Sequence, residues 1–471
     1  MEDRDVVIIG GGPAGYTAAI RVMQLGGKAT IIEKDTIGGM CLNHGCIPTV
    51  ALARAVELLE MGKNAKDYGI TYKDMKVDFL RMMSKKEAVV RTLVSGVKQM
   101  LEAYGVEVIE GKGRLTSSSL IEVHLKDGTK KELKARKIII STGSRYPKAS
   151  FSGGVKEVID PTEALKLKEI PKSMVIVGGG FIGSALATIF SRLDTKVSVV
   201  EESPRLLPQI DKEIVMILEK EFKDNSIQIY PNTRVTNIAI GKRDDLTIFI
   251  DHKVEKSRND CRTDTRPRGE EVTIEAHYVL ISEGRQANVE GLGLQEAGVS
   301  LNEKGGTAVN QQMETNVPGI YAVGDVTMEH MWTSVAYFEG TTAAENAMGQ
   351  NSKIDYKAIP YWTHTIPEIS SVGMTEEEAL AKGYKVRVGR FPFAGNGMAA
   401  ILGQRTGIVK VIKEERYGEV LGVHMIGPRT ADLIAEAALA MKMEGTPGEI
   451  AKTFHVHPSL SEALWEAARG A

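Results

Sequence analysis

The stretch GGMCLNHGCIPTV, residues 38–50, holds two of the chain's three cysteines, Cys41 and Cys46, with four residues between them. Two inert core cysteines are one interpretation. A metal site is a second, but His44 is the one histidine nearby and structural metal sites use more ligands, so we expect no metal. The third interpretation, which we favour, is a redox-active disulfide at the start of a helix, where the pKa of a thiol is lowered.

A second candidate lies near the C-terminus, in FHVHPSLSEALWEA. His457 precedes Pro458, and Glu462 follows five residues after the histidine. A lone histidine is usually structural. This spacing also suits a general base that a carboxylate orients, and the residues alone leave both interpretations open.

Two stretches of similar pattern organise the chain: DVVIIGGGPAGYTAAI from Asp5 and SMVIVGGGFIGSALAT from Ser173. Each is an apolar β-branched run, three glycines and a helix-like segment, and each is followed by a second apolar strand that ends in Glu33 or Glu201. This pattern predicts two βαβ nucleotide-binding units. The glycines also break the uncharged run 173–191, which is otherwise long enough for a membrane helix.

Glycine has a mechanical role at three places in each turn: the tight turn, the close approach to a pyrophosphate, and the packing of helix on strand. These places are, in that order, Gly10 and Gly178, Gly12 and Gly180, and Gly15 and Gly183. The phosphates would then lie at a helix N-terminus, which favours anions.

The acid at the end of each second strand lies 18 residues after the last glycine of its turn, where a carboxylate takes ribose hydroxyls. Glu201 is followed by Glu202, and two acids disfavour a 2′-phosphate. The second unit is therefore expected to bind NAD rather than NADP.

Other segments complete the coarse organisation. Residues 48–104 carry apolar residues at helical spacing. From about residue 351, KVRVGRFPF, TGIVKVIKEER and EVLGVHMIG predict antiparallel strands, and TADLIAEAALAMKM predicts an amphipathic helix. The charged segment 251–271, with Cys261, predicts a solvated hairpin or loop.

Composition excludes several classes of protein. The net charge of -2 gives no basic field for nucleic acid and no acidic tail. Three cysteines in 471 residues do not make a secreted disulfide framework. A reducing compartment is favoured, and we expect a cytoplasmic protein. The N-terminal MEDRDVVIIG enters an apolar strand directly, so no signal peptide is expected.

Over essentially its whole length the chain resembles the dihydrolipoamide dehydrogenases of the flavin disulfide reductase superfamily, on the motifs GGGPAG, GGMCLNHGCIP, STGS, GGGFIG, VPGIYAVGDV, FPFAGN and HVHPSLSEA. The resemblance implies an α/β fold with two Rossmann-like dinucleotide-binding domains and a C-terminal α+β dimerisation domain. The expected domains are FAD-binding at 1–148 and 276–347, NAD-binding at 149–275, and dimerisation at 348–471.

The resemblance also implies roles for the candidate residues. Cys41 would exchange with the dithiol substrate, and Cys46 would lie against the flavin as a thiolate. His457, held by Glu462, would deprotonate the substrate thiol at the disulfide of the other subunit of a homodimer. Electrons would pass from a lipoyl-bearing protein or lipoamide-type dithiol to the disulfide, to FAD and to NAD, with no nucleic-acid or membrane partner.

The cofactor-binding residues that these motifs imply are Gly10, Gly12, Pro13, Ala14, Gly15, Glu33, Lys34, Gly39, Gly113, Ser141, Thr142, Gly143, Gly178, Gly180, Phe181, Ile182, Gly183, Glu201, Gly284, Asp325, Met331, Trp332 and Thr333.

Three positions depart from the family pattern. The family reads Cys-Ile-Pro-Ser-Lys, and here Val50 replaces the lysine beside flavin N5. Ala185 replaces the glutamate that pairs with that lysine, so both partners are missing together. Removing one alone would leave a poorly solvated charge. Glu283 stands where the family has an aliphatic residue before its Gly-Arg.

Alternatives remain within and outside this class. A related flavin disulfide reductase could use another disulfide substrate or electron partner. Mercuric reductase is disfavoured because this chain has no cysteine pair near its C-terminus; its last cysteine is Cys261. Glutathione reductase is disfavoured by the N-terminal motifs and by Glu201. A flavin-bound redox or partner-binding subunit without turnover is the non-enzyme alternative, supported only by the missing Lys–Glu pair.

Overall fold

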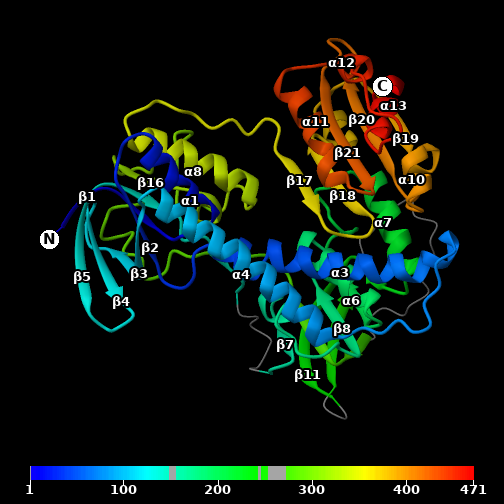
Figure 1. Cartoon of the computed structure of the whole chain (residues 1–471), viewed down its shortest axis with the longest axis horizontal. Coiled ribbons are helices and arrows are strands. Elements are labelled where there is room, and N and C mark those ends of the chain that lie inside the picture. The colour runs from blue at the N-terminus through cyan, green and yellow to red at the C-terminus, as the bar shows by residue number, and fades with distance from the viewer. Residues whose placement is uncertain (1, 148–154, 242–244, 253–271) are drawn as a thin grey trace. The chain divides into compact units, whose positions relative to one another are not determined.

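The computed structural model describes residues 2–147, 155–241, 245–252 and 272–471, which fall into two compact units (Figure 1). Unit 1 contains Met1–Ala51, Leu80–Pro147 and Gly284–Asp355. Unit 2 contains Leu52–Phe79, Lys148–Glu283 and Tyr356–Ala471. Most of the charged segment 251–271, with Cys261, lies outside the described residues.

Unit 1 is built on a six-stranded sheet whose core strands are parallel. In sheet order the strands are β1 (Glu2–Ile9), β2 (Ala29–Glu33), β3 (Glu107–Leu115), β4 (Leu120–Leu125), β5 (Lys130–Ile140) and β16 (Ile320–Ala322), and β1 also pairs with β5. Strands β1, β2, β5 and β16 are parallel, and β4 joins β3 to β5 with antiparallel pairing. A short antiparallel pair, β6 (Ser144–Arg145) and β15 (Gln286–Ala287), lies after β5.

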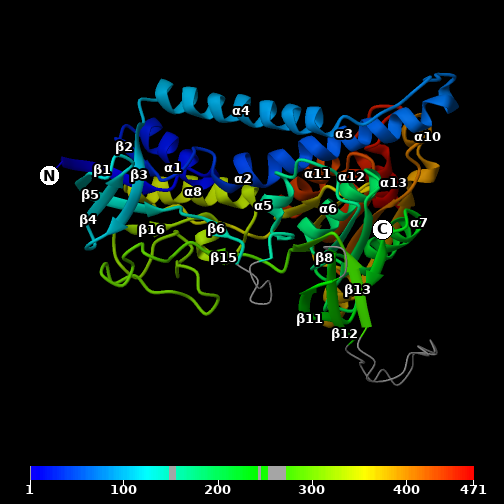
Figure 2. The same ribbon diagram turned by 90° about the horizontal axis from the view of Figure 1, so that it is seen from below.

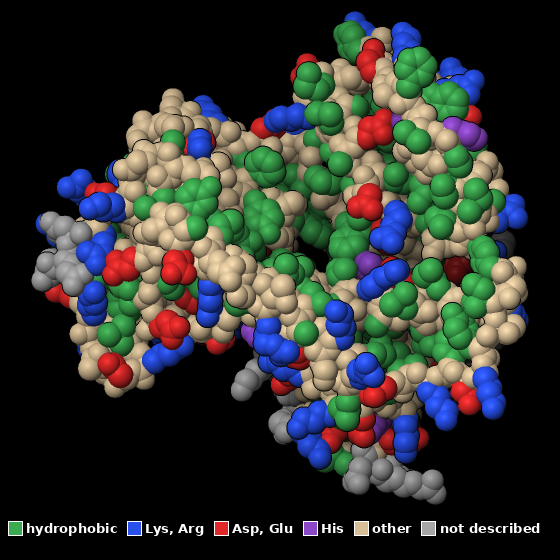
Figure 3. Space-filling view, in the orientation of Figure 1, with side chains coloured by type: hydrophobic (Ala, Val, Ile, Leu, Met, Phe, Trp, Pro, Cys, Tyr) green, Lys and Arg blue, Asp and Glu red, His purple; other side chains and the backbone are tan. Residues whose placement is uncertain are grey.

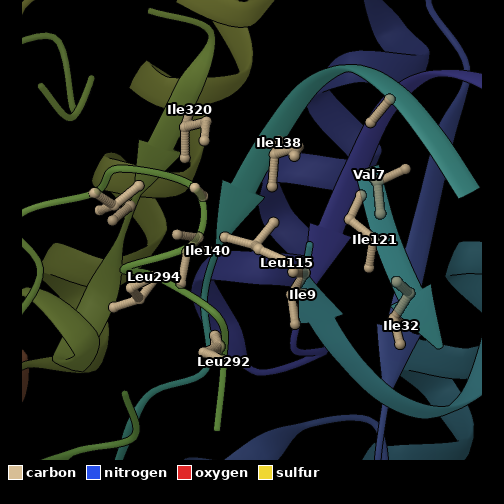
Figure 4. Close-up of a cluster of buried hydrophobic side chains, with 14 of the residues drawn as sticks. Val7, Ile9, Ile32, Leu115, Ile121, Ile138, Ile140, Leu292, Leu294 and Ile320 are labelled. Atoms are coloured by element: carbon tan, nitrogen blue, oxygen red, sulfur yellow. The ribbon is translucent and has the colours of Figure 1, made fainter. Parts of the chain in front are cut away.

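The interior of this sheet is a continuous apolar cluster (Figure 4). Parallel strands that are covered on both faces read as near-continuous β-branched runs, as VVII in β1 and KIII in β5 do. Side chains of β1 and β5, with Ile121 from β4 and Leu292 and Leu294 from a later segment, form the cluster. Burial of these strands fixes the strand ends from which the glycine turn and Ser141 emerge.

The helices of unit 1 begin with α1 (Pro13–Gln24), which packs beside α8 (Thr333–Ala347), as Figure 1 shows. The helical stretch expected at 48–104 is two helices, α3 (Cys46–Asn64) and α4 (Phe79–Ala103), preceded by the short α2 (Gly39–His44). A 3-10 turn, η1 (Ala65–Tyr68), ends at Gly69, which adopts a φ of 76°, so the helical pattern is broken there. A second 3-10 turn, η3 (Gly324–Thr327), follows β16.

Unit 2 holds the second parallel sheet, with the order β10 (Gln228–Tyr230), β9 (Lys196–Val200), β8 (Ser173–Val177), β14 (Tyr278–Ile281) and β7 (Val158–Ile159). Its helices are α5 (Pro161–Ala164), α6 (Phe181–Arg192) and α7 (Lys212–Asp224). The run 173–191 is thus a strand, a turn and a helix, as the glycines predict. In the part of the chain that the structure describes, no helix is long and apolar enough to cross a membrane.

The second sheet continues past residue 276, where the sequence placed the return to the FAD-binding domain. Strand β14 pairs in parallel with β8 and β7, and its buried VLI segment lies between these two strands of the sheet. The division between the compact units falls between Glu283 and Gly284.

Two antiparallel sheets complete unit 2. The first, β11 (Thr233–Ile240), β12 (Leu246–His252) and β13 (Val272–Ala276), lies beside β8 and β9 (Figure 2). The second has the order β17 (Pro360–Thr363), β18 (Glu368–Gly373), β21 (Val420–Gly427), β20 (Ile408–Glu414) and β19 (Val386–Pro392). Its helices are α9 (Glu376–Ala381), α10 (Gly397–Ile401), α11 (Thr430–Lys442), α12 (Pro447–Lys452) and α13 (Glu462–Gly470), with a 3-10 turn η4 (Phe393–Gly395). The predicted C-terminal strands and long helix are confirmed.

A buried ion pair joins α7 to β20 inside unit 2. Lys410 Nζ lies 2.9 Å from both carboxylate oxygens of Asp211, and both side chains are almost fully buried. Asp211 also caps α7, because it accepts a hydrogen bond from the backbone N–H of Glu213. Burial alone would raise the pKa of Asp211, but the ammonium of Lys410 holds it below the usual range.

We expect Lys410→Met to lower the free energy of unfolding by about 3–5 kcal/mol, because it leaves the Asp211 carboxylate buried without its cation. Lys410→Met with Asp211→Asn should recover most of the loss, since asparagine also caps helices. Chemical denaturation of the holoenzyme at neutral pH measures both. Equal stability of wild type and Lys410→Met would contradict a paired role for this charge.

Candidate active site

The two glycine turns have the same geometry. Gly10 and Gly178 adopt φ values of 107° and 99°, and a Cβ there would lie 2.4 Å from Ser141 O and 2.6 Å from Ser282 O. Only glycine fits both the backbone conformation and this contact. At the packing glycines, Gly15 and Gly183, a Cβ would lie 2.0 Å from the carbonyl oxygen of the first glycine in each turn.

The acid that follows each turn holds the turn itself. The Oε2 atoms of Glu33 and Glu201 each accept a hydrogen bond of 2.7 Å from the middle glycine, Gly11 or Gly179. Their Oε1 atoms accept backbone N–H groups two residues further along, at 2.8 and 2.7 Å. An ionised carboxylate has about four lone-pair sites, so each can still accept a ribose hydroxyl.

Both turns leave a helix N-terminus open. The N-cap residues of α1 and α6 are Gly12 and Gly180, and no side chain caps either helix. A Cβ at Gly180 would meet nothing within 4 Å, so there is room before α6 for a group that the backbone approaches closely. Unpaired N–H groups at such a terminus bind phosphate. The geometry therefore fits a pyrophosphate at each turn.

The remaining FAD-site candidates lie in unit 1, on the segments that follow the carboxyl ends of β2, β5 and β16. Gly39, at a φ of 55°, approaches the first turn so closely that a Cβ would lie 2.8 Å from Gly12 Cα. Ser141 donates a hydrogen bond of 2.7 Å to Gly10 O. Gly113 lies on β3, further along the sheet, with Ile9 and Ile32 at 3.3 Å from a Cβ placed there.

Cys41 and Cys46 are both free thiols in this structure, and they differ in environment. Cys41 lies on α2 and is buried, whereas Cys46 is the first residue of α3 and is exposed in the protein alone. The Sγ of Cys46 lies 3.5 Å from Thr333 Oγ1, at the start of α8. The structure therefore brings Thr333, a cofactor-site candidate, to the thiol pair.

The two thiols have opposite pKa shifts. The hydrogen bond from Cys41 lowers the pKa of Cys46 to about 6, and Thr333 and the positive charge of Arg285 lower it further; desolvation by the surrounding protein atoms opposes this, although the residue keeps exposed surface. The same hydrogen bond, with burial, raises the pKa of Cys41. Cys46 is therefore the more acidic thiol of the pair and Cys41 its hydrogen-bond donor, which suits Cys46 as the electron donor.

Asp325 is held in place by a residue that sequence reasoning missed. Arg285 donates from Nη1 to an Asp325 carboxylate oxygen and from Nη2 to Met331 O at 3.0 Å. Ser144 donates to the same carboxylate at 2.7 Å. Arg285 follows the candidate Gly284 directly. The Gly-Arg pair after strand β14 was therefore the feature of the sequence that could have identified this residue.

Two tyrosines near the thiols were also missed. Tyr16 on α1 and Tyr337 on α8 share a hydrogen bond of 3.0 Å between their hydroxyls. Burial raises the pKa of both phenols, and the nearby negative charge of the thiols adds to this. They lie far apart in the sequence, and only the packing of α1 beside α8 unites them.

At the second turn, in unit 2, the backbone oxygen of Phe181 accepts a hydrogen bond of 2.8 Å from Thr363 Oγ1. Glu283 lies near Glu201 and Glu202, and burial followed by the charge of Glu202 raises its pKa. Its carboxyl group is therefore more readily neutralised than an exposed glutamate. Val50 lies on α3 and Ala185 is buried on α6.

The C-terminal pair has the geometry expected of an oriented base. His457 Nδ1 lies 2.8 Å from Glu462 Oε1, and Glu462 Oε2 accepts the backbone N–H of Ser459 at 2.9 Å. The hydrogen bonds from Ser459 and His457 hold the pKa of Glu462 below its usual range. The imidazole is 79% exposed, so its Nε2 can reach a group outside this chain.

Exposed apolar side chains lie on the same C-terminal segment as this pair. Figure 3 shows hydrophobic side chains on the face of the C-terminal segment that carries α11 and α12. The exposed apolar residues of this segment include Leu439, Met443, Phe454 and Val456. Such patches mark protein–protein interfaces.

Two open phosphate-binding turns, a thiol pair with opposite pKa shifts and an exposed oriented histidine are the machinery of a two-nucleotide disulfide oxidoreductase. Residues 4–350 match the family described as "Pyridine nucleotide-disulphide oxidoreductase", and residues 359–468 match its dimerisation domain. The chain belongs to this family. It is an FAD-dependent disulfide oxidoreductase that uses NAD, and it carries a dimerisation domain.

Curated relatives cover almost the whole chain. Dihydrolipoyl dehydrogenase from Bacillus subtilis is 37% identical, over 99% of this chain and 98% of the relative. The enzyme of that name from Thermus scotoductus is 38% identical, over 99% and 97%. Leghemoglobin reductase from Glycine max is 35% identical, over 99% and 87%.

Solved structures agree with this fold. LpdA from Mycobacterium tuberculosis superposes with a TM-score of 0.89 at 26% identity, covering 100% of this chain and 99% of that one. The Cu(II) complex of the HOCl-induced flavoprotein disulfide reductase RclA from Escherichia coli gives 0.86 at 26% identity, with coverages of 100% and 99%.

We expect Thr333→Val to raise the pKa of the Cys46 thiol by about one to two units, because a hydrogen bond to a charged group contributes roughly 1.5–3 kcal/mol and one pKa unit is 1.36 kcal/mol. The thiolate fraction at neutral pH then falls. Titration of the thiolate–flavin absorbance of the two-electron-reduced enzyme measures this pKa. Thr333→Ser keeps the hydroxyl, so its Cys46 thiol should have the wild-type pKa. A wild-type pKa in Thr333→Val would show that the Thr333 hydroxyl does not stabilise the Cys46 thiolate.

Proposed function

We propose that this enzyme oxidises a protein-bound dihydrolipoyl dithiol, with NAD⁺ as the final electron acceptor. The opposite pKa shifts of Cys41 and Cys46 carry the proposal, because they separate an exchanging sulfur from a thiolate donor. The full-length relatives named dihydrolipoyl dehydrogenase support the choice of substrate.

The chemistry is two successive thiol–disulfide exchanges. A substrate thiolate attacks Cys41 of the Cys41–Cys46 disulfide, forms a mixed disulfide and releases the Cys46 thiolate. The second substrate thiol then attacks the substrate sulfur of the mixed disulfide, which releases oxidised lipoyl disulfide and the Cys41 thiol. The His457 imidazole takes the proton of the attacking thiol, and Glu462 stabilises the imidazolium.

Bound FAD would supply a two-electron acceptor for the thiol pair and a hydride donor for NAD⁺. The residues proposed to hold it are the first glycine turn, Glu33 and the Asp325–Arg285 pair. The second turn and Glu201 would hold NAD. Both acids lie where a carboxylate takes ribose hydroxyls.

The active assembly is proposed to be a homodimer in which His457 of one chain serves the thiol pair of the other. The exposure of His457, the exposed apolar side chains of the C-terminal segment and the match to a dimerisation domain support this arrangement. A cytoplasmic location is proposed from the low cysteine count and the reactive thiols, which need a reducing compartment.

A different electron partner is the second candidate. Val50 and Ala185 stand in place of the family's Lys–Glu pair, and Glu283 adds a carboxyl group in the NAD-binding region. The relative named leghemoglobin reductase shows that family names extend to other acceptors. Steady-state turnover with dihydrolipoamide and NAD⁺ tests both: rapid NADH formation supports the first, and reduction of the enzyme by dihydrolipoamide without NADH formation supports the second.

We expect His457→Gln to lower turnover of dihydrolipoamide by about 10²–10⁴-fold, the range for loss of a positioned general base. Reduction of the flavin by NADH should be nearly unchanged, because that step does not use the base. Stopped-flow and steady-state assays separate the two. The matched control is His124→Gln, since His124 and Glu122 form a similar pair at 2.6 Å on β4; wild-type turnover in His457→Gln would exclude the proposed role.

The family's Lys–Glu pair, which Val50 and Ala185 replace in this chain, gives a second test. Ala185→Glu alone should destabilise the protein, because it places a carboxylate at a buried position, and Val50→Lys alone should weaken FAD retention. Val50→Lys with Ala185→Glu should raise the flavin potential and the rate of hydride exchange with NAD above wild type. Redox titration and stopped-flow reduction measure these. Unchanged rate and potential in the double variant would show that the replacement is neutral.

A further inference from the structure

Three ligand-type side chains from distant parts of the sequence meet inside unit 2. They are Glu57 on α3, His364 between β17 and β18, and Glu368 at the start of β18. One ligand atom from each lies within 4.8 Å of the other two. His364 and Glu368 are buried, and Glu57 is partly exposed, which leaves a route from solvent.

The imidazole in this cluster has one close polar contact, with Glu57, and no hydrogen bond of good geometry. His364 is 7% exposed, and neither ring nitrogen makes a hydrogen bond within the described part of the chain. Its Nε2 lies 3.3 Å from Glu57 Oε1, in poor alignment for a hydrogen bond. Two ligand atoms that bind the same tetrahedral Zn²⁺ ion, each about 2.0–2.1 Å from it, also lie about 3.3 Å from one another.

Each carboxylate already has one oxygen fixed by N–H donors. Arg54 Nη1 donates to Glu57 Oε2 at 2.8 Å. The backbone N–H of Ala431 and the Trp362 indole donate to Glu368 Oε2 at 3.3 and 3.4 Å. The Oε1 atoms are therefore the ones that can face an ion. Such outer hydrogen bonds orient ligands in metal sites.

The ring of Trp362 packs against that of His364 in an edge-on arrangement, with centroids 5.1 Å apart. This contact fixes the imidazole plane without using a ring nitrogen. The charges also agree with a cation: two carboxylates, Glu57 and Glu368, face one guanidinium, that of Arg54, and the imidazole of His364.

We propose that Glu57, His364 and Glu368 bind one divalent transition-metal ion, with Zn²⁺ as the expected occupant. One imidazole and two carboxylates are ligands that Zn²⁺ accepts, with water at the fourth position. The imidazole disfavours Ca²⁺ and Mg²⁺, which prefer oxygen ligands. The sequence did not suggest this site, because Glu57 is far from the other two ligands along the chain.

The ion would fix α3 to the C-terminal sheet. Helix α3 is continuous from Cys46 to Asn64, and Glu57 lies about 16 Å along it from Cys46 at 1.5 Å per residue. The site is thus structural and separate from the thiol pair. Its occupancy should appear as thermal stability of the protein, independently of substrate turnover.

The test uses oxidised holoenzyme, in which a Cys41–Cys46 disulfide keeps both sulfurs from binding metal. The enzyme is treated with a chelator, dialysed against Zn²⁺ and then analysed for metal, and its melting temperature is compared with and without Zn²⁺. We expect one Zn²⁺ per chain and a higher melting temperature. In His364→Gln and in Glu57→Gln the affinity for Zn²⁺ should fall by at least about 100-fold. Loss of a residue that only hydrogen-bonds a metal ligand already costs up to about 100-fold.

Three controls separate this site from others. Glu60→Gln changes the same helix outside the cluster. His124→Gln and His457→Gln each remove an exposed His–Glu pair elsewhere in the chain. All three variants should still bind one Zn²⁺ per chain. FAD content and melting temperature without metal confirm folding of each variant, and Glu57→Gln, at a partly exposed position, serves if His364→Gln fails to fold. The absence of Zn²⁺ binding by wild type, equal binding by Glu57→Gln, or loss of binding in His457→Gln would each overturn the proposal.

Discussion

A carboxylate at the end of a buried strand, bound to the backbone N–H of a glycine turn, is the interaction on which both nucleotide sites depend. It occurs twice with the same length, at Glu33 with Gly11 and at Glu201 with Gly179. The acid satisfies the middle N–H of each turn, so the N–H groups at the following helix terminus stay free for phosphate. The parallel strands hold the acid in place, because they are buried on both faces.

The difference in acidity between Cys41 and Cys46 depends on their positions on two successive helices. Helix α3 begins at Cys46, whereas Cys41 lies on the preceding short helix. The Cys46 sulfur therefore lies at a helix N-terminus, near the Thr333 hydroxyl and the positive charge of Arg285, and the Cys41 thiol donates a hydrogen bond to it. Two cysteines of equal intrinsic acidity become a thiolate and a thiol through position alone.

Much of this architecture follows from local sequence. The glycine turns, their acids and the C-terminal strands were predictable, because strand periodicity and turn residues act over a few neighbours. Contacts such as Tyr16 with Tyr337, or Asp211 with Lys410, were not, since each joins distant segments that only packing brings together. The break near Gly69 in the predicted helix was also missed, because the apolar spacing continues on both sides of it.

The two hydrogen bonds that Glu201 accepts have a consequence for protein engineering. Exchange of this acid for a small or basic residue is the usual route from NAD to NADP specificity, because it makes room for a 2′-phosphate. Here the exchange would also leave the backbone N–H groups of Gly179 and Ser203 without an acceptor, at about 1–3 kcal/mol for each that stays buried. With Glu201 as the proposed ribose ligand, coenzyme preference and the stability of the turn depend on the same side chain, and a redesign needs a neutral acceptor such as an amide oxygen at position 201.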